Sequence, residues 1–421
     1  MNKSLTNKIL ITLAFLFAYR ILAYVPVPGV NADVVAEFFN QNSSNALGLF
    51  NMFSGGAAER FSIISLGIMP YITASIIMEL LAATFHSIGK MKKERDGMQK
   101  YMQIIRYATI FITLVQSIGV SIGLQNLRGS QGQSAIMIED LNTFIALSAL
   151  SMLAGTMLLM WLGEQITQKG VGNGISLIIF AGIVSSIPSA IDGTIGLINS
   201  GEMNFLVAFL ILLVILLTIG AIIYVELGER RIPISYSRKV VMQNQNKRIM
   251  NYIPIKVNLS GVIPPIFASA ILMFPATIMQ SSTNEYVLMI NDYLNPNGYL
   301  FHILTFFFVI FFAYFYASIV FNAKDIAENL KKQGGFIPGI RPGEGTANYL
   351  NTVASHLTLS GSIYLGLVST LPWLLVKFMG VPFYFGGTSV LIVVQVALDT
   401  MRKIEAQIYM NKYQTLSAVG L

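Results

Sequence analysis

The stretch LFNMFSGGAAERFSIISLGIMPYI, residues 49–72, poses the question on which the fold depends. It reads as a short apolar helix, a Gly-Gly break, an adjacent Glu-Arg pair, and a second apolar run that contains a proline. Glycine tolerates backbone angles that other residues avoid, and proline lacks a backbone N–H, so both interrupt regular structure. Any fold for this chain must explain why an apolar segment is broken here.

The composition places the chain in a membrane. Its 421 residues are 54% hydrophobic and only 11% charged, and the mean hydropathy is +0.65. A spanning helix needs about 20 predominantly apolar residues. Runs of that kind predict an all-α polytopic membrane protein with ten transmembrane helices, at 9–25, 62–84, 104–124, 142–163, 174–191, 204–225, 262–281, 300–321, 353–376 and 382–401.

The distribution of basic residues predicts the orientation. Basic residues near span ends resist translocation, so the side that is rich in Lys and Arg is cytoplasmic. Most of the 27 Lys and Arg fall on the side of the N-terminus; Arg60, Arg128 and Lys377 lie on the other side, and Arg20 lies inside the first span. We therefore expect both termini in the cytoplasm. The net charge of +7 then belongs to one face, which suits an anionic lipid surface or an acidic or RNA-bearing partner, or simply sets the topology.

The spans divide into an N-terminal half, residues 1–203, and a C-terminal half, residues 204–421. An odd number of spans in each half would make the second half an inverted repeat of the first. Aligning SLGIMPYITASI (65–76) with SGVIPPIFASAI (260–271) supports this, because Pro70 matches Pro265. These prolines predict a bend or a separation early in the second span of each half. Two unrelated kinked helices remain the alternative.

Two long cytoplasmic loops, 226–258 and 322–352, carry turn and strand signals. RIPISYS and IPIKV in the first loop alternate apolar and polar residues, which predicts a hairpin. The second loop predicts an amphipathic helix over 324–332, followed by GGFIPGIRPGEGT, a stiff turn that presents Arg341. We interpret the pair as a docking platform for a large partner; solvated linkers are the alternative.

The sequence offers little material for catalysis. It contains no cysteine and three histidines, and it lacks a zinc-binding or a nucleotide-binding motif. Charged residues inside the spans are few, and we interpret Arg20, Arg106 and Glu79 as snorkelling or interfacial side chains. We therefore expect no enzymatic activity, no metal site and no cofactor.

Isoleucines recur at helical spacing in several spans. Ile68 and Ile72 are four residues apart, and so are Ile179 and Ile183. Ile266 and Ile392 lie in the seventh and tenth spans. Periodicity alone favours ordinary packing for such residues.

Several longer segments resemble one known family. The sequence matches the SecY family, the channel subunit of the protein translocase, in LFNMFSGGA, GIMPYITASII, GNGISLIIFAGIV, KVNLSGVIPPIFAS, FPATI, GFIPGIRPGEGT and YFGGTSVLIVV, in the family's order and over nearly the whole chain. The resemblance implies a central hourglass pore. It also implies that residues 45–60 form a plug half-helix that can move, with Asn51 and Phe53 inside it and Gly55 and Gly56 as its joint.

The resemblance further assigns residues to the pore and its side exit. The six isoleucines, namely Ile68, Ile72, Ile179, Ile183, Ile266 and Ile392, would form a hydrophobic ring around a passing chain. The lateral gate would lie between spans two and three and span seven, opposed by span eight, with Pro70, Thr73, Gln116 and Phe274. Ala270 departs from the family, because some relatives carry serine there, so a polar contact at this position is in doubt.

A protein-conducting channel is the function that the resemblance implies. It would secrete unfolded polypeptides across the bacterial cytoplasmic membrane and release apolar segments sideways into the membrane lipids. The implied partners are the SecE and SecG membrane subunits, the SecA motor ATPase, the ribosome and signal sequences, with Arg230, Arg231 and Arg341 as docking residues. The alternative is an inverted-repeat secondary transporter, which should place polar ligands where the two halves meet.

Overall fold

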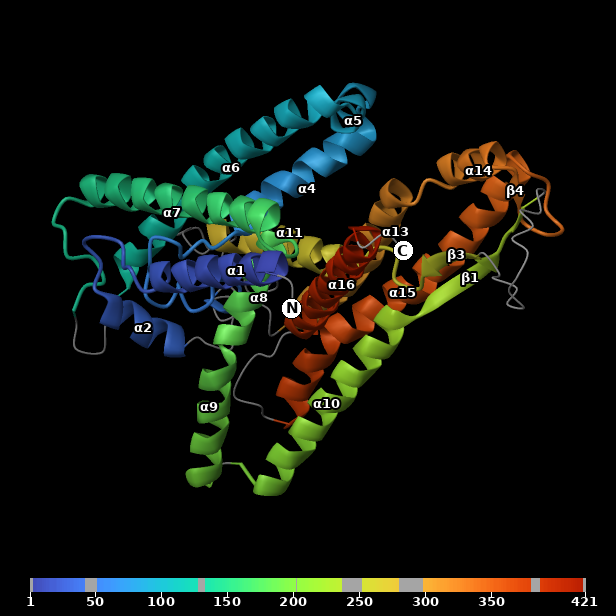
Figure 1. Ribbon diagram of the computed structural model, residues 1–421. Helices are drawn as coiled ribbons and strands as arrows, with labels where there is room; N and C mark the ends of the chain where they lie inside the picture. The colour runs from blue at the N-terminus through green and yellow to red at the C-terminus, as the bar shows by residue number, and fades with distance from the viewer. Residues whose placement is uncertain are drawn as a thin grey trace.

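The computed structural model of this chain describes residues 3–41, 51–127, 133–201, 203–236, 252–279, 298–379 and 387–418. Helices dominate these residues (Figure 1). The helices at the predicted spans are α1 (Lys3–Leu22), α4 (Met69–Thr84), α6 (Arg95–Gly123), α7 (Leu141–Lys169), α8 (Gly174–Ser185), α9 (Ile187–Asn199), α10 (Phe205–Leu227), α11 (Ile263–Met279), α13 (Tyr299–Val320), α15 (Glu344–Met379) and α16 (Gly387–Ala418).

Each predicted span contains a helix among the residues that the structure describes, and the chain is an all-α polytopic membrane protein. Within the described ranges, six helical stretches are each long and apolar enough to cross a membrane, and α4 with the bent helix α5 (His86–Lys93) makes up to seven. The fifth predicted span contains two helices, α8 and α9, which are separated at Ser186. Since α11, α15 and α16 are not among those stretches, the count of ten remains a prediction from the sequence.

The prolines mark helix starts, so Pro70 and Pro265 separate each helix from the chain before it and do not bend a continuous helix. Residues 55–68 form turns, and α4 begins only at Met69, with Pro70 in its first turn. Pro265 likewise lies in the first turn of α11. The N–H groups of a first turn have no partner within the helix, so proline costs nothing there. The second predicted span is therefore shorter at its start than expected.

The two halves meet along two seams. α11 contacts α4 and α6 of the other half, and α16 contacts α8 and α1. Figure 1 shows α9 and α10 as the two arms of a V, which makes the short segment between them the covalent link between the halves. An inverted relation between the halves remains a prediction.

Between α1 and α4 the chain forms a small cap that the sequence did not predict. Its helix α2 (Ala32–Gln41) follows the first predicted span. Isolated β-bridges join Pro26 to Ser62 and Val30 to Ile136. A separate apolar cluster, which includes Val35 and Phe144, fills its interior.

The turns before α4 rest on the backbone of α7. At Gly155 in α7, a Cβ would lie 2.0 Å from the carbonyl oxygen of Ile63. No side chain fits between these two backbones, so Gly155 sets how closely the turns approach α7. Gly193 in α9 offers a contrast, because a Cβ there would meet no atom within 4 Å.

We predict that Gly155→Ala lowers the stability of the protein by about 1–3 kcal/mol, the usual effect of overpacking. Gly193→Ala should leave stability unchanged or raise it slightly, because alanine favours helix more than glycine does. Thermal unfolding of the purified protein in detergent, followed by tryptophan fluorescence, measures both. Equal midpoints for the two variants would contradict the close contact between α7 and the turns.

Candidate functional site

The six isoleucines come together in one apolar cluster. Ile72 lies on α4 and Ile68 is the residue that precedes this helix, with the Ile72 amide donating to the Ile68 carbonyl at 3.1 Å. Five of the six side chains are buried, and Ile266 is half-buried against the same cluster. The remaining members lie on α8 (Ile179 and Ile183), α11 (Ile266) and α16 (Ile392). We call these six residues the constriction ring.

The constriction ring lies at the junction of the two halves. α4 and α8 belong to the N-terminal half, and α11 and α16 to the C-terminal half, so the ring joins helices from both seams. Branched aliphatic side chains pack tightly and offer no hydrogen-bond partner to water or ions. The cluster is therefore suited to sealing a passage.

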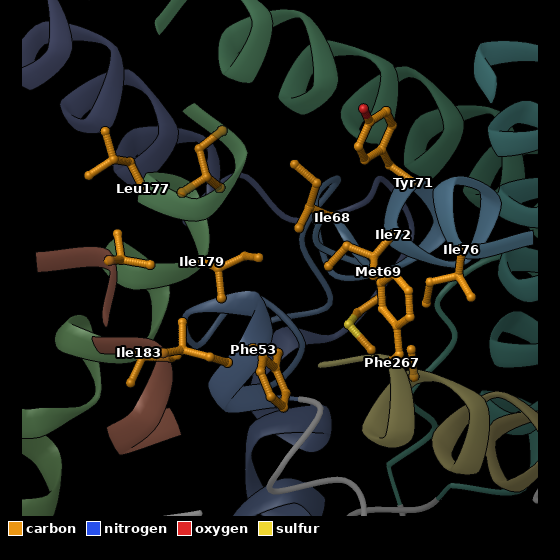
Figure 2. Packing of buried hydrophobic residues seen from close by; sticks show 14 of the residues in the cluster. Phe53, Ile68, Met69, Tyr71, Ile72, Ile76, Leu177, Ile179, Ile183 and Phe267 are labelled. Atoms are coloured by element: carbon orange, nitrogen blue, oxygen red, sulfur yellow. The ribbon is translucent and has the colours of Figure 1, made fainter. Parts of the chain in front are cut away.

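Phe53, which lies in the stretch 49–72 quoted at the start, packs into the same cluster as the ring. Residues 51–54 are helical, and Phe53 is 7% exposed within the same cluster. Figure 2 shows Phe53 between Ile183 on one side and Met69 and Phe267 on the other. Residues 45–50 of the predicted plug lie outside the described residues. We call residues 51–60 the plug segment.

The plug segment is attached to α1 and α8 by hydrogen bonds. The Tyr19 hydroxyl donates to the Ser54 carbonyl at 3.1 Å, and the Arg20 guanidinium donates to the Gly55 carbonyl. Arg20 also donates to the Ser185 hydroxyl at 3.0 Å. The guanidinium of Arg20 therefore turns toward the plug segment, and its interpretation as a snorkelling or interfacial side chain stays a prediction.

The Gly-Gly break has a conformational and a packing cause. Gly55 and Gly56 have φ angles of +71° and +79°, in the left-handed region that favours glycine. A Cβ on Gly55 would lie 2.5 Å from the Tyr19 hydroxyl and 2.9 Å from the Gly182 Cα. Gly55 therefore lets the plug segment lie directly on α8. Its role as a flexible joint remains a prediction.

The Glu-Arg pair after the break folds the plug segment on itself. The Asn51 side chain donates to the Glu59 carboxylate at 2.9 Å and accepts from the Glu59 amide at 3.0 Å. Arg60 pairs with Glu59 at 3.2 Å, and its guanidinium lies 4.2 Å from the centre of the Tyr24 ring. The interruption in the sequence is thus a compact loop with its own internal bonds.

The residues predicted for the lateral gate lie on α4, α6 and α11, and α11 contacts both of the other two helices. Thr73 on α4 is buried, and its hydroxyl donates to the Met69 carbonyl at 3.1 Å. Gln116 on α6 is also buried, and its Oε1 has no hydrogen-bond partner among the described residues. Phe274 lies in α11, but its side chain is outside the description. Pro70 lies in the first turn of α4, as described above.

The two long loops that the sequence places at 226–258 and 322–352 fold as one unit. The predicted hairpin is confirmed, because β1 (Glu229–Pro233) pairs antiparallel with β3 (Tyr252–Lys256). β2 (Ser235–Tyr236) pairs with β4 (Gly335–Phe336) of the second loop, after the confirmed helix α14 (Ala323–Lys332). These strands, α14 and the start of α15 share one apolar cluster. We call this structure the docking unit; sequence reasoning missed that its two loops are joined.

The predicted docking residues are exposed on this unit. Arg230 and Arg231 lie on β1, and Arg341 lies in the turn after β4. Arg231 pairs with Glu229 at 2.6 Å, which raises its pKa through the hydrogen bond to that carboxylate. In Figure 1 the unit projects from the end of the molecule opposite to α2. An exposed arginine suits a contact with a negatively charged partner.

A buried hydrogen bond connects the docking unit to the start of α11. Asn258, between β3 and α11, donates to the Glu226 carboxylate at the end of α10 at 2.6 Å, and both residues are buried. The Asn258 amide oxygen accepts from the Gly261 amide at 3.0 Å, directly before α11 begins. Asn258 thus holds the base of the hairpin and the start of α11 together. This pair could not be predicted from the sequence, since its residues lie far apart in the chain.

Comparisons with known proteins agree with this architecture. The family model for SecY matches residues 62–401. The protein translocase subunit SecY of Helicobacter pylori is 70% identical over 421 residues, with 100% of each chain covered. Among solved structures, one of a SecY protein whose plug domain stabilises the closed state of the translocation channel has a TM-score of 0.68 at 19% identity. It covers 96% of this chain and 93% of its own.

A second solved structure, Sec61 in the canine ribosome-channel complex from the endoplasmic reticulum, has a TM-score of 0.62 at 18% identity. It also covers 96% of this chain and 93% of its own. At these identities the two structures show that the fold is shared.

The bond between Asn258 and Glu226 can be tested by substitution. We predict that Asn258→Ala destabilises the protein by about 1–3 kcal/mol, because it leaves a buried carboxylate without its partner. Adding Glu226→Gln should restore part of the loss, because an uncharged amide is less costly to bury. The midpoint of thermal unfolding in detergent measures both. The pairing would be contradicted if the two substitutions were additive, that is, if Glu226→Gln lowered the stability of the Asn258→Ala variant as much as it lowers that of the parent.

Proposed function

This chain belongs to the SecY family of protein translocase subunits, and from that premise we propose that its constriction ring is the passage for unfolded polypeptides. The observation that supports the proposal is that all six isoleucines, from both halves of the chain, belong to one apolar cluster. Such a ring can fit around a chain of any sequence while giving ions no polar ligand. The plug segment and Phe53 then close the passage at rest.

A secondary transporter is the function that this ring disfavours. Transporters of inverted-repeat architecture bind substrate and coupling ions with polar groups where the repeats meet. Here the side chains of the ring are aliphatic. A channel that passes chains without binding them needs a surface of this kind.

The seam between α11 and the helices α4 and α6 supports a second exit, into the lipid. Parting this seam would open the passage sideways, with Thr73 and Gln116 on one wall and α11, which α13 supports, on the other. A segment of about 20 apolar residues is more stable in hydrocarbon than in a wet pore. Apolar signal sequences and membrane segments would leave by this gate.

The free energy for movement must come from a partner that docks on the cytoplasmic side. We assign this docking to the exposed Arg230, Arg231 and Arg341, with the SecA motor or the ribosome as partners; the Sec61 neighbour was solved with a ribosome. SecE would hold the two halves together and SecG would be peripheral. The protein would lie in the bacterial cytoplasmic membrane with both termini in the cytoplasm, and would itself catalyse no reaction.

We predict that Ile72→Asn and Ile392→Asn open the seal, because an amide gives water and ions a partner in the ring. Both variants should raise the ion conductance of channels in planar bilayers several-fold and export precursors with defective signal sequences. Ile77→Asn is the matched control, since Ile77 is also on α4 but 44% exposed. Conductance equal to the parent in both ring variants would exclude these residues from the seal.

We predict that Arg341→Glu slows motor-driven export while the protein still folds, because the charge reversal repels an acidic contact. Lys169→Glu, an exposed basic residue at the end of α7, is the control for the change in net charge. Export into vesicles with purified motor and ATP measures the rate, and thermal unfolding verifies the fold. A normal rate for Arg341→Glu would count against docking at this turn.

A further inference from the structure

The end of the plug helix is capped by side chains from outside the plug segment. Carbonyls at the end of a helix have no partner within the helix. Here the Ser54 carbonyl accepts from the Tyr19 hydroxyl at 3.1 Å, and the Gly55 carbonyl accepts from Arg20 and, at 3.5 Å, from the Ser185 hydroxyl. Two donors lie on α1 and the third ends α8. These bonds exist only while the plug segment is in place.

The surroundings make these bonds costly to break. Tyr19 is 1% exposed, Arg20 is partly buried, and a Cβ on Gly55 would lie only 2.9 Å from the Gly182 Cα. In such a place a hydrogen bond to a charged donor is worth more than an ordinary one, and a group left without a partner is penalised. If the plug segment moved away, the Tyr19 hydroxyl would lose its hydrogen bond to the Ser54 carbonyl.

Arg20 has further contacts that hold its charge in position. Its guanidinium donates to the Tyr24 hydroxyl at 3.3 Å and to Ser185 at 3.0 Å. The guanidinium of Arg60 in the plug segment also lies over the Tyr24 ring. Arg20 is thus directed at the Gly55 carbonyl by groups that would remain when the plug segment moves.

We propose that Tyr19, Arg20 and Ser185 form a latch on the plug segment, and that the latch determines how apolar a signal sequence must be to open the channel. The inference rests on the proposed plug. A signal sequence can shift the channel from closed to open only by its difference in affinity for the two states. Each latch bond favours the closed state, so weakening the latch lowers the apolarity that a signal sequence needs.

The absence of cysteine from the chain permits a direct test. A single cysteine introduced by Ala57→Cys, at a position 0% exposed in the plug segment, reports displacement through its rate of reaction with a polar maleimide in lipid nanodiscs. Tyr19→Phe, which removes only the hydroxyl, should raise this rate about 2- to 10-fold, the effect of one net hydrogen bond. Arg20→Gln should raise it about 10- to 100-fold, because its bond is charged.

Arg106→Gln is the matched control for the loss of an arginine. Arg106 pairs with Glu164 through three hydrogen bonds at 2.7, 2.8 and 3.2 Å between α6 and α7, and these bonds do not involve the plug segment. The labelling rate should stay at the parent value in this variant. In an export assay, the latch variants should also accept a precursor with a shortened apolar signal that the parent and Arg106→Gln reject.

The outcomes separate the latch from the plug. Unchanged labelling in both Tyr19→Phe and Arg20→Gln overturns the latch, as does faster labelling in Arg106→Gln alone. The plug itself is tested in the parent by stalling a translocating chain in the channel. If stalling leaves the labelling of Ala57→Cys unchanged, the proposed plug is overturned together with the latch. If Arg20→Gln does not fold, Tyr19→Phe decides, because it preserves the ring and its packing.

Discussion

The structure depends on one contact, the aliphatic junction between the two halves at the constriction ring. Apolar surfaces attract each other without direction, and separating them costs free energy in proportion to the area exposed. An ion pair at the same place would cost more to desolvate and would give ions a ligand. In the channel that we propose, the six isoleucines would therefore close tightly and part again without breaking a specific bond. The rest of the fold holds this junction in register: α9 and α10 join the halves covalently, and the two seams flank the ring.

Polar contacts, by contrast, fix the segments that would decide whether the proposed channel is open or closed. Asn51 and Glu59 shape the plug segment, and Tyr19 and Arg20 attach it to α1. At the other end, Asn258 ties the docking unit to α11, which forms one wall of the proposed gate. The chain thus combines a non-directional seal with a few directional bonds near its moving pieces. This combination suits a passage that must accept any sequence yet open only on a signal, because the seal ignores side chains and the bonds set the threshold.

Features with a local cause could be predicted from the sequence. Hydropathy located the helices, alternation located the hairpin of β1 and β3, and the helix α14 followed from its amphipathic pattern. Features that depend on distant residues could not. Nothing near Tyr19 or Arg20 indicates a partner at Ser54 or Gly55, and the pairing of β2 with β4 joins loops about 100 residues apart along the printed sequence. Pro70 left a bend and a separation open, because proline signals an interruption but not whether the helix bends or begins there. The six isoleucines were grouped by family resemblance alone, since periodicity could not separate them from ordinary packing.

The claim that the constriction ring surrounds the translocating chain can be measured by site-specific photo-crosslinking. A photoreactive amino acid is placed at Ile183 or Ile392 in the ring, or at Leu213, which is 44% exposed on α10, as the control. A polypeptide is then stalled during its passage through the channel. We predict crosslinks between this polypeptide and both ring positions and none from Leu213. Crosslinks absent from the ring positions while the polypeptide is stalled across the membrane would contradict it.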